Sequence, residues 1–184
     1  LIAGPPRSGR SSALTVLAAA WREAWPDGEL IVYSRRRATS LTQWAESVDA
    51  AILDDARALD DHVAALLDAA PRRRTAFVID DAERVADDDH RLLDLAASRV
   101  SGVVLFAAGR PDAIRLQFGH WTAVIRRSRL GAVLTGGADT DFEVFGELPV
   151  RHPPLAPRPG LAWTYDLTGR HLVQWATIAT PATI

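Results

Sequence analysis

Three short runs of almost uninterrupted apolar residues constrain the fold of this chain more than any other feature. They cover residues 29–34 (ELIVYS), 75–81 (TAFVIDD) and 102–109 (GVVLFAAG). Runs of this length, apolar at nearly every position, are typical of strands that are buried on both faces of a sheet. Between them lie longer segments with apolar residues at helical spacing, such as 11–25 and 87–99. This alternation predicts an α/β domain with a mostly parallel sheet and helices on both faces.

Further segments extend the same pattern. An apolar lead at residues 1–3 fits the end of another strand, and residues 41–70 have room for one or two helices. Residues 112–118 (DAIRLQF) predict a further helix. At least one expected helix thus separates each of the expected strands at residues 1–3, 29–34, 75–81 and 102–109, as a parallel sheet requires.

The last third of the chain has a different pattern, with short strands and loops. Short strands are expected within residues 122–127 (TAVIRR) and 131–137 (GAVLTGG). The proline-rich stretch 149–160 is expected to be an ordered crossover. It leads into residues 161–178, which predict a C-terminal β-hairpin that turns at Thr168-Gly169.

Composition limits the class of protein. The 184 residues are 48% hydrophobic and 24% charged, which is typical of one globular domain. A net charge of -2 gives no reason to expect non-specific binding to nucleic acid. The chain has no cysteine, no signal peptide and no apolar run of membrane-spanning length. Because it also lacks an initiator methionine, we expect residues 1–184 to be a single domain cut from a longer, multi-module protein.

The segment after the apolar lead, GPPRSGRS at residues 4–11, has the layout of a phosphate-binding loop. In such loops backbone N–H groups surround the phosphates, a lysine reaches the β- and γ-phosphates, and a hydroxyl binds Mg²⁺. Arg10 stands where the lysine is expected, and its planar, forked guanidinium is not an equivalent point charge. The residues predicted to bind nucleotide are Gly4, Ser8, Gly9, Arg10, Ser11 and Ser12.

The amino-acid usage of the chain accounts for part of this substitution. All 21 basic residues are arginine, and lysine is absent. A G- and C-rich genome favours arginine codons, so mutational bias contributes to Arg10. Bias alone should not remove a lysine that the chemistry requires, and the substitution therefore still bears on function.

A second motif, FVIDD at residues 77–81, completes the expected site. An aspartate at the end of a buried strand can hold Mg²⁺, and the next carboxylate can orient an attacking water. These considerations assign Asp80, with Ser11, to the metal and give Asp81 a weak catalytic assignment. Together the two motifs, about 70 residues apart, predict a site for ATP and Mg²⁺.

Simpler interpretations of these residues remain open. The glycine loop could be an ordinary strand-to-helix turn capped by Ser11 or Ser12, and the two aspartates could end a strand and cap a helix. A nucleotide site that is folded but catalytically silent is a third interpretation. The arginine runs 35–37 and 72–74 are expected to be solvated loops, and the histidines have no metal-ligand spacing.

The order of these motifs resembles the FtsK/SpoIIIE family of RecA-like P-loop NTPase modules. The matching segments, in order, are GPPRSGRSS, IVYSRR, FVIDD, GVVLFAAGR and PRPGLAW with HLVQWA. The resemblance is greatest to the C-terminal ATPase modules of EccC/EssC proteins of type VII secretion and their actinobacterial relatives. Ser34 departs from the pattern, because the family commonly has an acidic residue before Arg35-Arg36.

The resemblance implies a function. Later EccC modules are often degenerate, bind nucleotide without fast turnover, regulate the first module and dock the export signal of small helical secreted proteins. Arg10 and Ser34 align the chain with these modules, which implies impaired or absent ATP hydrolysis. The implied partners are other ATPase modules of the same chain, exported proteins and a hexameric full-length assembly, but not nucleic acid. The implied location is cytoplasmic, at the inner face of the membrane through other parts of the protein.

Three functional hypotheses follow. The first is a degenerate ATP-binding module in protein export. The second is an active motor ATPase in which Arg10 replaces the lysine and Asp81 orients water. The third is a structural domain that binds no nucleotide.

Overall fold

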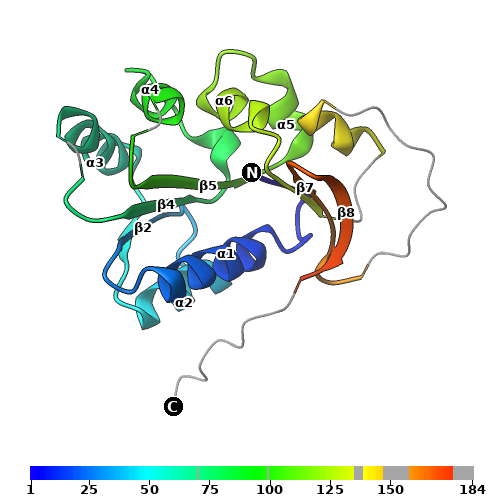
Figure 1. Cartoon of the computed structure of the whole chain (residues 1–184), viewed down its shortest axis with the longest axis horizontal. Helices are drawn as coiled ribbons and strands as arrows, with labels where there is room; N and C mark the ends of the chain where they lie inside the picture. Colours follow the sequence, from blue (N-terminus) through cyan, green and yellow to red (C-terminus); the bar gives the residue numbers. More distant parts are fainter. Residues whose placement is uncertain (70, 99, 135–138, 147–157, 176–184) are drawn as a thin grey trace.

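The computed structural model describes residues 1–69, 71–98, 100–134, 139–146 and 158–175, and these form an α/β domain around one sheet (Figure 1). The strands within these ranges have the spatial order β3-β2-β4-β5-β1-β6-β7-β8. Strands β1 to β6 pair in parallel, and β7 and β8 add an antiparallel hairpin beside β6. The strands are β1 (Ile2–Ala3), β2 (Glu29–Tyr33), β3 (Ala51–Leu53), β4 (Thr75–Ile79), β5 (Val103–Gly109), β6 (Gly131–Leu134), β7 (Leu161–Asp166) and β8 (Gly169–Gln174).

Helices cover both faces of the sheet. Helices α1 (Arg10–Ala24) and α2 (Ser40–Ser47) lie on one face, below the sheet in Figure 1. The opposite face carries α3 (Ala56–Asp68), α4 (Arg91–Ser98), α5 (Pro111–Leu116) and α6 (Trp121–Arg127), with the 3₁₀ segments η1 (Ala82–Arg84) and η2 (Asp139–Phe145). The predicted mostly parallel sheet, its two helical layers and the C-terminal hairpin are all confirmed. No helix within the described ranges has both the length and the apolar character needed to span a bilayer.

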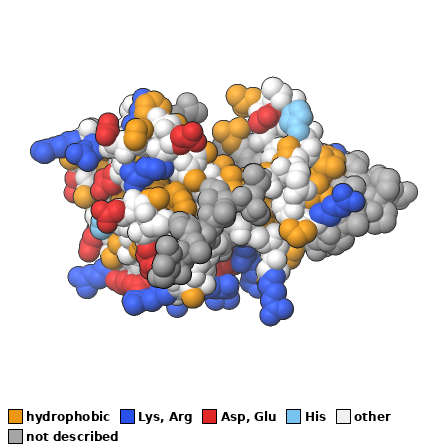
Figure 2. All heavy atoms as spheres, turned by 90° about the horizontal axis from the view of Figure 1, so that it is seen from below, with side chains coloured by type: hydrophobic (Ala, Val, Ile, Leu, Met, Phe, Trp, Pro, Cys, Tyr) orange, Lys and Arg blue, Asp and Glu red, His pale blue; other side chains and the backbone are white. Residues whose placement is uncertain are grey.

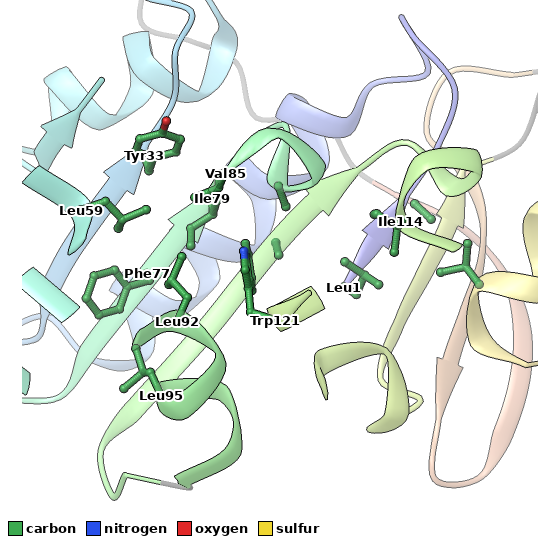
Figure 3. Close-up of a cluster of buried hydrophobic side chains, with 14 of the residues drawn as sticks. Leu1, Tyr33, Leu59, Phe77, Ile79, Val85, Leu92, Leu95, Ile114 and Trp121 are labelled. Atoms are coloured by element: carbon green, nitrogen blue, oxygen red, sulfur yellow. The ribbon is translucent and has the colours of Figure 1, made fainter. Parts of the chain in front are cut away.

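The two faces of β4 explain why its sequence is apolar at every position. Ala76 and Val78 belong to the core beneath the sheet, together with Leu14 of α1 and Leu41 of α2. Phe77 and Ile79 alternate with them and point into the core on the other side (Figure 3). Because successive side chains of a strand point to opposite faces, a strand between two helical layers has no solvent-facing position.

The second core includes Trp121, which directly precedes the segment that the sequence pattern placed in a strand. Trp121 is fully buried in the cluster that also contains Leu92, Leu95 and Ile114 (Figure 3). The segment TAVIRR, expected to be a strand, is the helix α6 instead. The His120 ring accepts a hydrogen bond from the backbone of Thr122 and caps this helix. The β-branched residues suggested a strand, but the segment forms a helix whose first three residues, Trp121, Thr122 and Ala123, are all buried.

Two other expectations differ from the structure. Strand β3 was not predicted, because its three residues lie at the sheet edge and are too few to form an apolar run. Helix α4 begins at Arg91 rather than at Asp87, because the Asp87 carboxylate accepts hydrogen bonds from the backbone of Leu92 and Leu93. Most of the expected proline-rich crossover, residues 149–157, lies outside the described residues.

The parallel strands all end at the same edge of the sheet, and this edge gathers the predicted site. Gly4 follows β1, Ser34 follows β2 and Asp80 follows β4. Strand β5 lies between β1 and β4, and the connections from β2 and β4 run in opposite directions. In parallel sheets, ligands bind beyond the carboxyl ends of the strands at such a reversal.

Candidate functional site

The loop between β1 and α1 has the geometry of an anion-binding turn. Gly9 has a φ of 95°, and Arg7 has a φ of 65°. No side chain caps the N-terminus of α1 among the described residues, so the first N–H groups of this 15-residue helix are free for a ligand. A Cβ on Gly4 would lie 2.4 Å from Ser8 Oγ. Glycine is therefore favoured at both predicted positions, by crowding against Ser8 at Gly4 and by backbone conformation at Gly9.

Ser8 is a second sign that the loop is built to hold something polar. Its Oγ is buried and has no hydrogen-bond partner within the described part of the chain. A buried hydroxyl without a partner costs free energy, so native structures seldom retain one without a reason. A phosphate oxygen in the loop would provide an acceptor for this hydroxyl.

Ser11 and Asp80 meet at the start of α1 and the end of β4. Ser11 Oγ donates a 2.6 Å hydrogen bond to Asp80 Oδ2, and Asp80 Oδ1 accepts one of 2.9 Å from the backbone N–H of Asp81. Asp80 is buried, and its own N–H donates to the carbonyl of Tyr33 on β2. A hydroxyl and a carboxylate, both hard oxygen donors, are ligands that Mg²⁺ prefers. These two residues therefore fit the predicted metal position.

Arg10 turns back into the loop and is buried. Its Nη2 donates a 2.8 Å hydrogen bond to Asp81 Oδ1, and its Nη1 donates one of 3.4 Å to the carbonyl of Gly4. The guanidinium thus joins the first residue of the loop to the second carboxylate of the site. Its charge is directed at Asp81, where a lysine in this position would be directed at a phosphate.

Asp81 is bound by a second arginine as well. Arg36 Nη2 lies 3.2 Å from Asp81 Oδ2, so each carboxylate oxygen faces a guanidinium. Asp81 has a φ of 48°, in the left-handed region that aspartate tolerates better than most residues. Both oxygens of the carboxylate that was expected to orient water therefore face a positive charge, which neutralises this group.

Ser34 explains how Arg36 reaches the site. The Ser34 hydroxyl is buried at the end of β2, donates to the carbonyl of Arg36 and accepts from its backbone N–H. These contacts fold the chain into a tight turn directly after the strand. The expected solvated loop is exposed, since the Arg36 and Arg37 side chains are 62% and 85% accessible, but both form ion pairs. Sequence reasoning missed Arg36 because a contact across the sheet edge has no local signal.

The remaining predicted residue, Ser12, lies at the margin of the site. It is exposed, and its Oγ is 3.3 Å from Ser40 Oγ at the start of α2. Nearby, burial raises the pKa of the Tyr33 phenol at the end of β2, which keeps this group neutral. The structure thus brings Gly4, Ser8, Gly9, Arg10, Ser11, Asp80 and Asp81 together, with Ser12 at the edge.

A further ion pair, between Glu83 and Arg110, follows the two aspartates and has no signature in the sequence. The Glu83 side chain is 3% exposed, and Arg110 Nε lies 3.3 Å from Glu83 Oε1. Arg110 precedes α5, and Gln117 at its other end donates a 3.0 Å hydrogen bond to the carbonyl of Glu83. His120 Nε2 lies 2.9 Å from the carbonyl of Val85. Segment η1, directly after Asp81, is therefore tied to α5 and α6.

Comparison with known proteins identifies the fold. No family model and no curated protein matches the sequence. Among solved structures, the second and third ATPases of Thermomonospora curvata EccC, in complex with a signal-sequence peptide, match 97% of this chain with a TM-score of 0.75 and 20% identity. The second and third ATPases of EssC from Geobacillus thermodenitrificans match 97% of it with a TM-score of 0.69 and 16% identity.

A protein from another process has the same fold. The conjugation coupling protein TcpA, solved as a monomer form with ATPγS, matches 95% of this chain with a TM-score of 0.68 and 15% identity. The chain spans 36% of the EccC and EssC structures and 59% of the TcpA structure. The chain therefore has the P-loop ATPase fold that the resemblance predicts, and its structural neighbours are EccC and EssC ATPase domains.

Proposed function

We propose that this chain is a degenerate P-loop module of an EccC- or EssC-like secretion ATPase, which binds ATP with Mg²⁺ but hydrolyses it slowly or not at all. In this role it regulates neighbouring ATPase modules of the same protein and docks the exported polypeptide. The observation that carries the proposal is the ion pair between Arg10 and Asp81. It diverts the two side chains that would otherwise contact the γ-phosphate and the attacking water.

The other half of the site supports nucleotide binding. Ser11 and Asp80 are the residues that would hold Mg²⁺, and the free N–H groups at the start of α1 would hold phosphate oxygens. Bound Mg²⁺ supplies positive charge that offsets the charge of the phosphates. The chain thus has groups suited to binding, while the carboxylate expected to orient water is paired with two arginines, and this combination favours a regulatory site over a motor.

The neighbours support the secretion context. The EccC structure contains a signal-sequence peptide, and the EccC and EssC structures both contain more than one ATPase. By analogy, the partners of this chain would be other ATPase modules of the same protein and a secreted polypeptide. A hexameric assembly, and a location at the inner face of the membrane through other parts of the protein, belong to the same proposal.

Calorimetric titration with ATP in the presence of Mg²⁺, together with a phosphate-release assay, tests the proposal. We expect binding without steady turnover, and weaker binding for Asp80→Asn. Asp27→Asn is the matched control, because Asp27 is exposed and far from the site in the fold. Steady hydrolysis that Asp80→Asn abolishes would support an active motor instead. If ATP produces neither binding heat nor thermal stabilisation, both nucleotide hypotheses are wrong and the structural-domain hypothesis remains.

A further inference from the structure

A concave surface rich in arginine lies on the other side of the molecule from α1. A pocket of about 470 Å³ opens between α5, the C-terminal end of α6 and the end of η2. Its floor includes the buried Val144 and Phe145. The side chains around it include Arg115, Arg126, Arg127, Arg129 and Phe118. We call this region the α5–α6 surface.

The charge on this surface differs from that of the whole chain. Residues 110–130 contain five arginines and one acidic residue, in a chain whose net charge is -2. Figure 2 shows the face beneath the sheet, where arginine and acidic side chains are interspersed. The α5–α6 surface therefore concentrates positive charge that composition alone conceals.

Two of these arginines are free to bind a partner. Arg127 and Arg129 are exposed, and neither side chain has a hydrogen bond or an ion pair within the described ranges. Arg115 already contacts the carboxylate of Glu143, another residue that lines the pocket. A carboxylate can thus be accommodated here, and two further guanidinium groups remain for others.

Phe118 lines this pocket, and two further exposed apolar residues, Leu116 and Leu130, directly follow the lining residues Arg115 and Arg129 in the sequence. Phe118 is 76% exposed, Leu116 is 68% exposed and Leu130 is 47% exposed. These are three of the six large hydrophobic residues that are exposed in the described part of the chain. Clustering of exposed apolar side chains with arginine is typical of a protein interaction site.

The shape and chemistry favour a peptide over other anionic partners. Binding of single-stranded nucleic acid commonly uses several aromatic side chains for stacking, whereas Phe118 is the exposed aromatic residue of this surface within the described ranges. A lipid headgroup layer is flat, and the arginines here surround a hollow. A peptide with acidic and apolar residues matches both the guanidinium groups and the hydrophobic side chains.

We propose that the α5–α6 surface binds a polypeptide segment that carries both acidic and large apolar side chains. This inference rests on the proposed docking role, because it assigns that role a surface and a partner chemistry. It does not depend on nucleotide binding, since the surface shares no residue with the phosphate loop.

The probe is a fluorescein-labelled synthetic peptide of about 14 residues, roughly four helical turns, with glutamate and leucine at helical spacing. Its binding to the chain is measured by fluorescence anisotropy. We expect Arg127→Glu/Arg129→Glu to weaken binding about tenfold, since two favourable charge pairs become repulsive. Phe118→Ser should weaken it by a similar factor by removing apolar contact area.

Arg72→Glu/Arg73→Glu is the matched control, because it makes the same charge change at two exposed arginines on another part of the surface. It should change the peptide affinity less than about twofold. A peptide in which glutamine replaces glutamate should bind about tenfold more weakly than the acidic peptide. Circular dichroism confirms that each variant is folded.

Several results would overturn the inference. One is that the acidic peptide does not bind, and another is that the control pair loses as much peptide affinity as Arg127→Glu/Arg129→Glu. A third is that Arg127 and Arg129 bind only a single-stranded oligonucleotide or anionic phospholipid vesicles. ATP titration of the same samples separates this outcome from failure of the nucleotide proposal. The Arg127→Glu/Arg129→Glu variant should bind ATP as the unmodified chain does.

Discussion

Asp80 and Asp81 follow strand β4 at consecutive positions, yet their carboxylates have partners of different kinds. Asp80 accepts from the neutral hydroxyl of Ser11 and from a backbone N–H, whereas Asp81 faces the guanidinium groups of Arg10 and Arg36. Their α1 partners, Ser11 and Arg10, are also consecutive. Two adjacent residue pairs on the same two elements have therefore diverged in chemistry.

Under the proposed function, this difference would separate nucleotide binding from hydrolysis within one loop. A hydroxyl bound to a carboxylate leaves the negative charge of Asp80 available to a cation. A buried arginine bound to Asp81 neutralises that carboxylate and makes each charge depend on the other for its stability. Arg10, which stands where a lysine is expected, thus has a structural role through Asp81.

The largest expected effect is on the free energy of unfolding, which Asp81→Asn should lower more than Asp80→Asn. Asp81→Asn should lower the free energy of unfolding by about 3 kcal/mol, because it leaves the buried Arg10 cation without its counter-charge. Asp80→Asn should cost only about 1 kcal/mol, since asparagine keeps one acceptor oxygen. Urea unfolding measures both values. Equal losses of unfolding free energy for the two variants would contradict the difference between the aspartates. Adding Arg10→Met to Asp81→Asn should restore part of the stability, because it removes the unpaired buried cation.

A second arginine–carboxylate pair extends the comparison beyond the nucleotide site. Arg110→Gln should cost about 2 kcal/mol of unfolding free energy, because it leaves the Glu83 carboxylate buried without a cation. The value is set below that for Asp81 because the Arg110 side chain is 39% exposed and solvent screens its charge. Urea unfolding of Arg110→Gln and of Glu83→Gln/Arg110→Gln checks this. The double variant should be the more stable of the two, and the reverse order would argue against a stabilising pair.

Arg10→Lys tests whether the pairing of Arg10 with Asp81 limits ATP binding, ATP hydrolysis or both. A lysine can direct its charge at phosphate, so ATP affinity should rise about tenfold, which corresponds to about 1.4 kcal/mol. Turnover should stay low while Arg36 remains beside Asp81. Calorimetry and phosphate release measure these effects.

Further removal of Arg36 sharpens this test. In the Arg10→Lys background, Arg36→Ala should raise turnover by freeing Asp81, and Arg37→Ala should not, because Arg37 pairs with Asp54 instead. If Arg10→Lys alone restores full hydrolysis, Arg36 has no restraining effect on Asp81.

The smallest effect concerns Asp166, an exposed aspartate whose partners resemble those of Asp80. Its Oδ1 accepts from the hydroxyl and N–H of Thr168 and from the N–H of Gly169, which closes the β7–β8 turn. The Thr168 hydroxyl in particular lowers the pKa of Asp166 below its ordinary value of 3.8. The carboxylate therefore stabilises the hairpin fully above this ordinary value, and the contribution disappears as pH falls through the lowered pKa.

This pH dependence can be measured by following the amide signal of Gly169 by NMR during acid titration. Asp166→Asn should remove the transition. Because solvent surrounds this carboxylate, Asp166→Asn should change the free energy of unfolding less than Asp81→Asn, Arg110→Gln or Asp80→Asn. A loss of unfolding free energy as large as that of the buried carboxylates would contradict the expectation that solvent exposure weakens the contribution of Asp166.

Much of the fold could be predicted from local pattern, and the failures have identifiable causes. The apolar strands β2, β4 and β5 were predictable because a strand between two helical layers must be apolar at nearly every position. Helix α6 was not, because its β-branched residues favour a strand locally, whereas the elements that it packs against, such as α4, lie elsewhere in the sequence. Edge strand β3 was missed because three half-exposed residues carry no such pattern.

The candidate site also contains residues that the sequence pattern predicted and residues that it did not. The residues of the loop and the aspartates follow from the spacing of glycines, hydroxyls and carboxylates along the chain. The meeting of Ser11 with Asp80 also follows, since the carboxyl ends of parallel strands share one edge. Arg36 and the Glu83–Arg110 pair could not be predicted, because arginine side chains are long and flexible and several acidic residues lie within their reach.

By itself, the sequence determined that this chain forms a mostly parallel α/β sheet and that a glycine loop containing Arg10 follows its first strand. Both properties depend on short-range order: which residues are apolar, and where glycine and carboxylate stand relative to the strands. Only the tertiary structure decided that Arg10 binds Asp81, that Arg36 joins it, and that arginines from α5 and α6 surround one pocket. Those outcomes depend on distances between residues far apart in the chain, and packing alone fixes such distances.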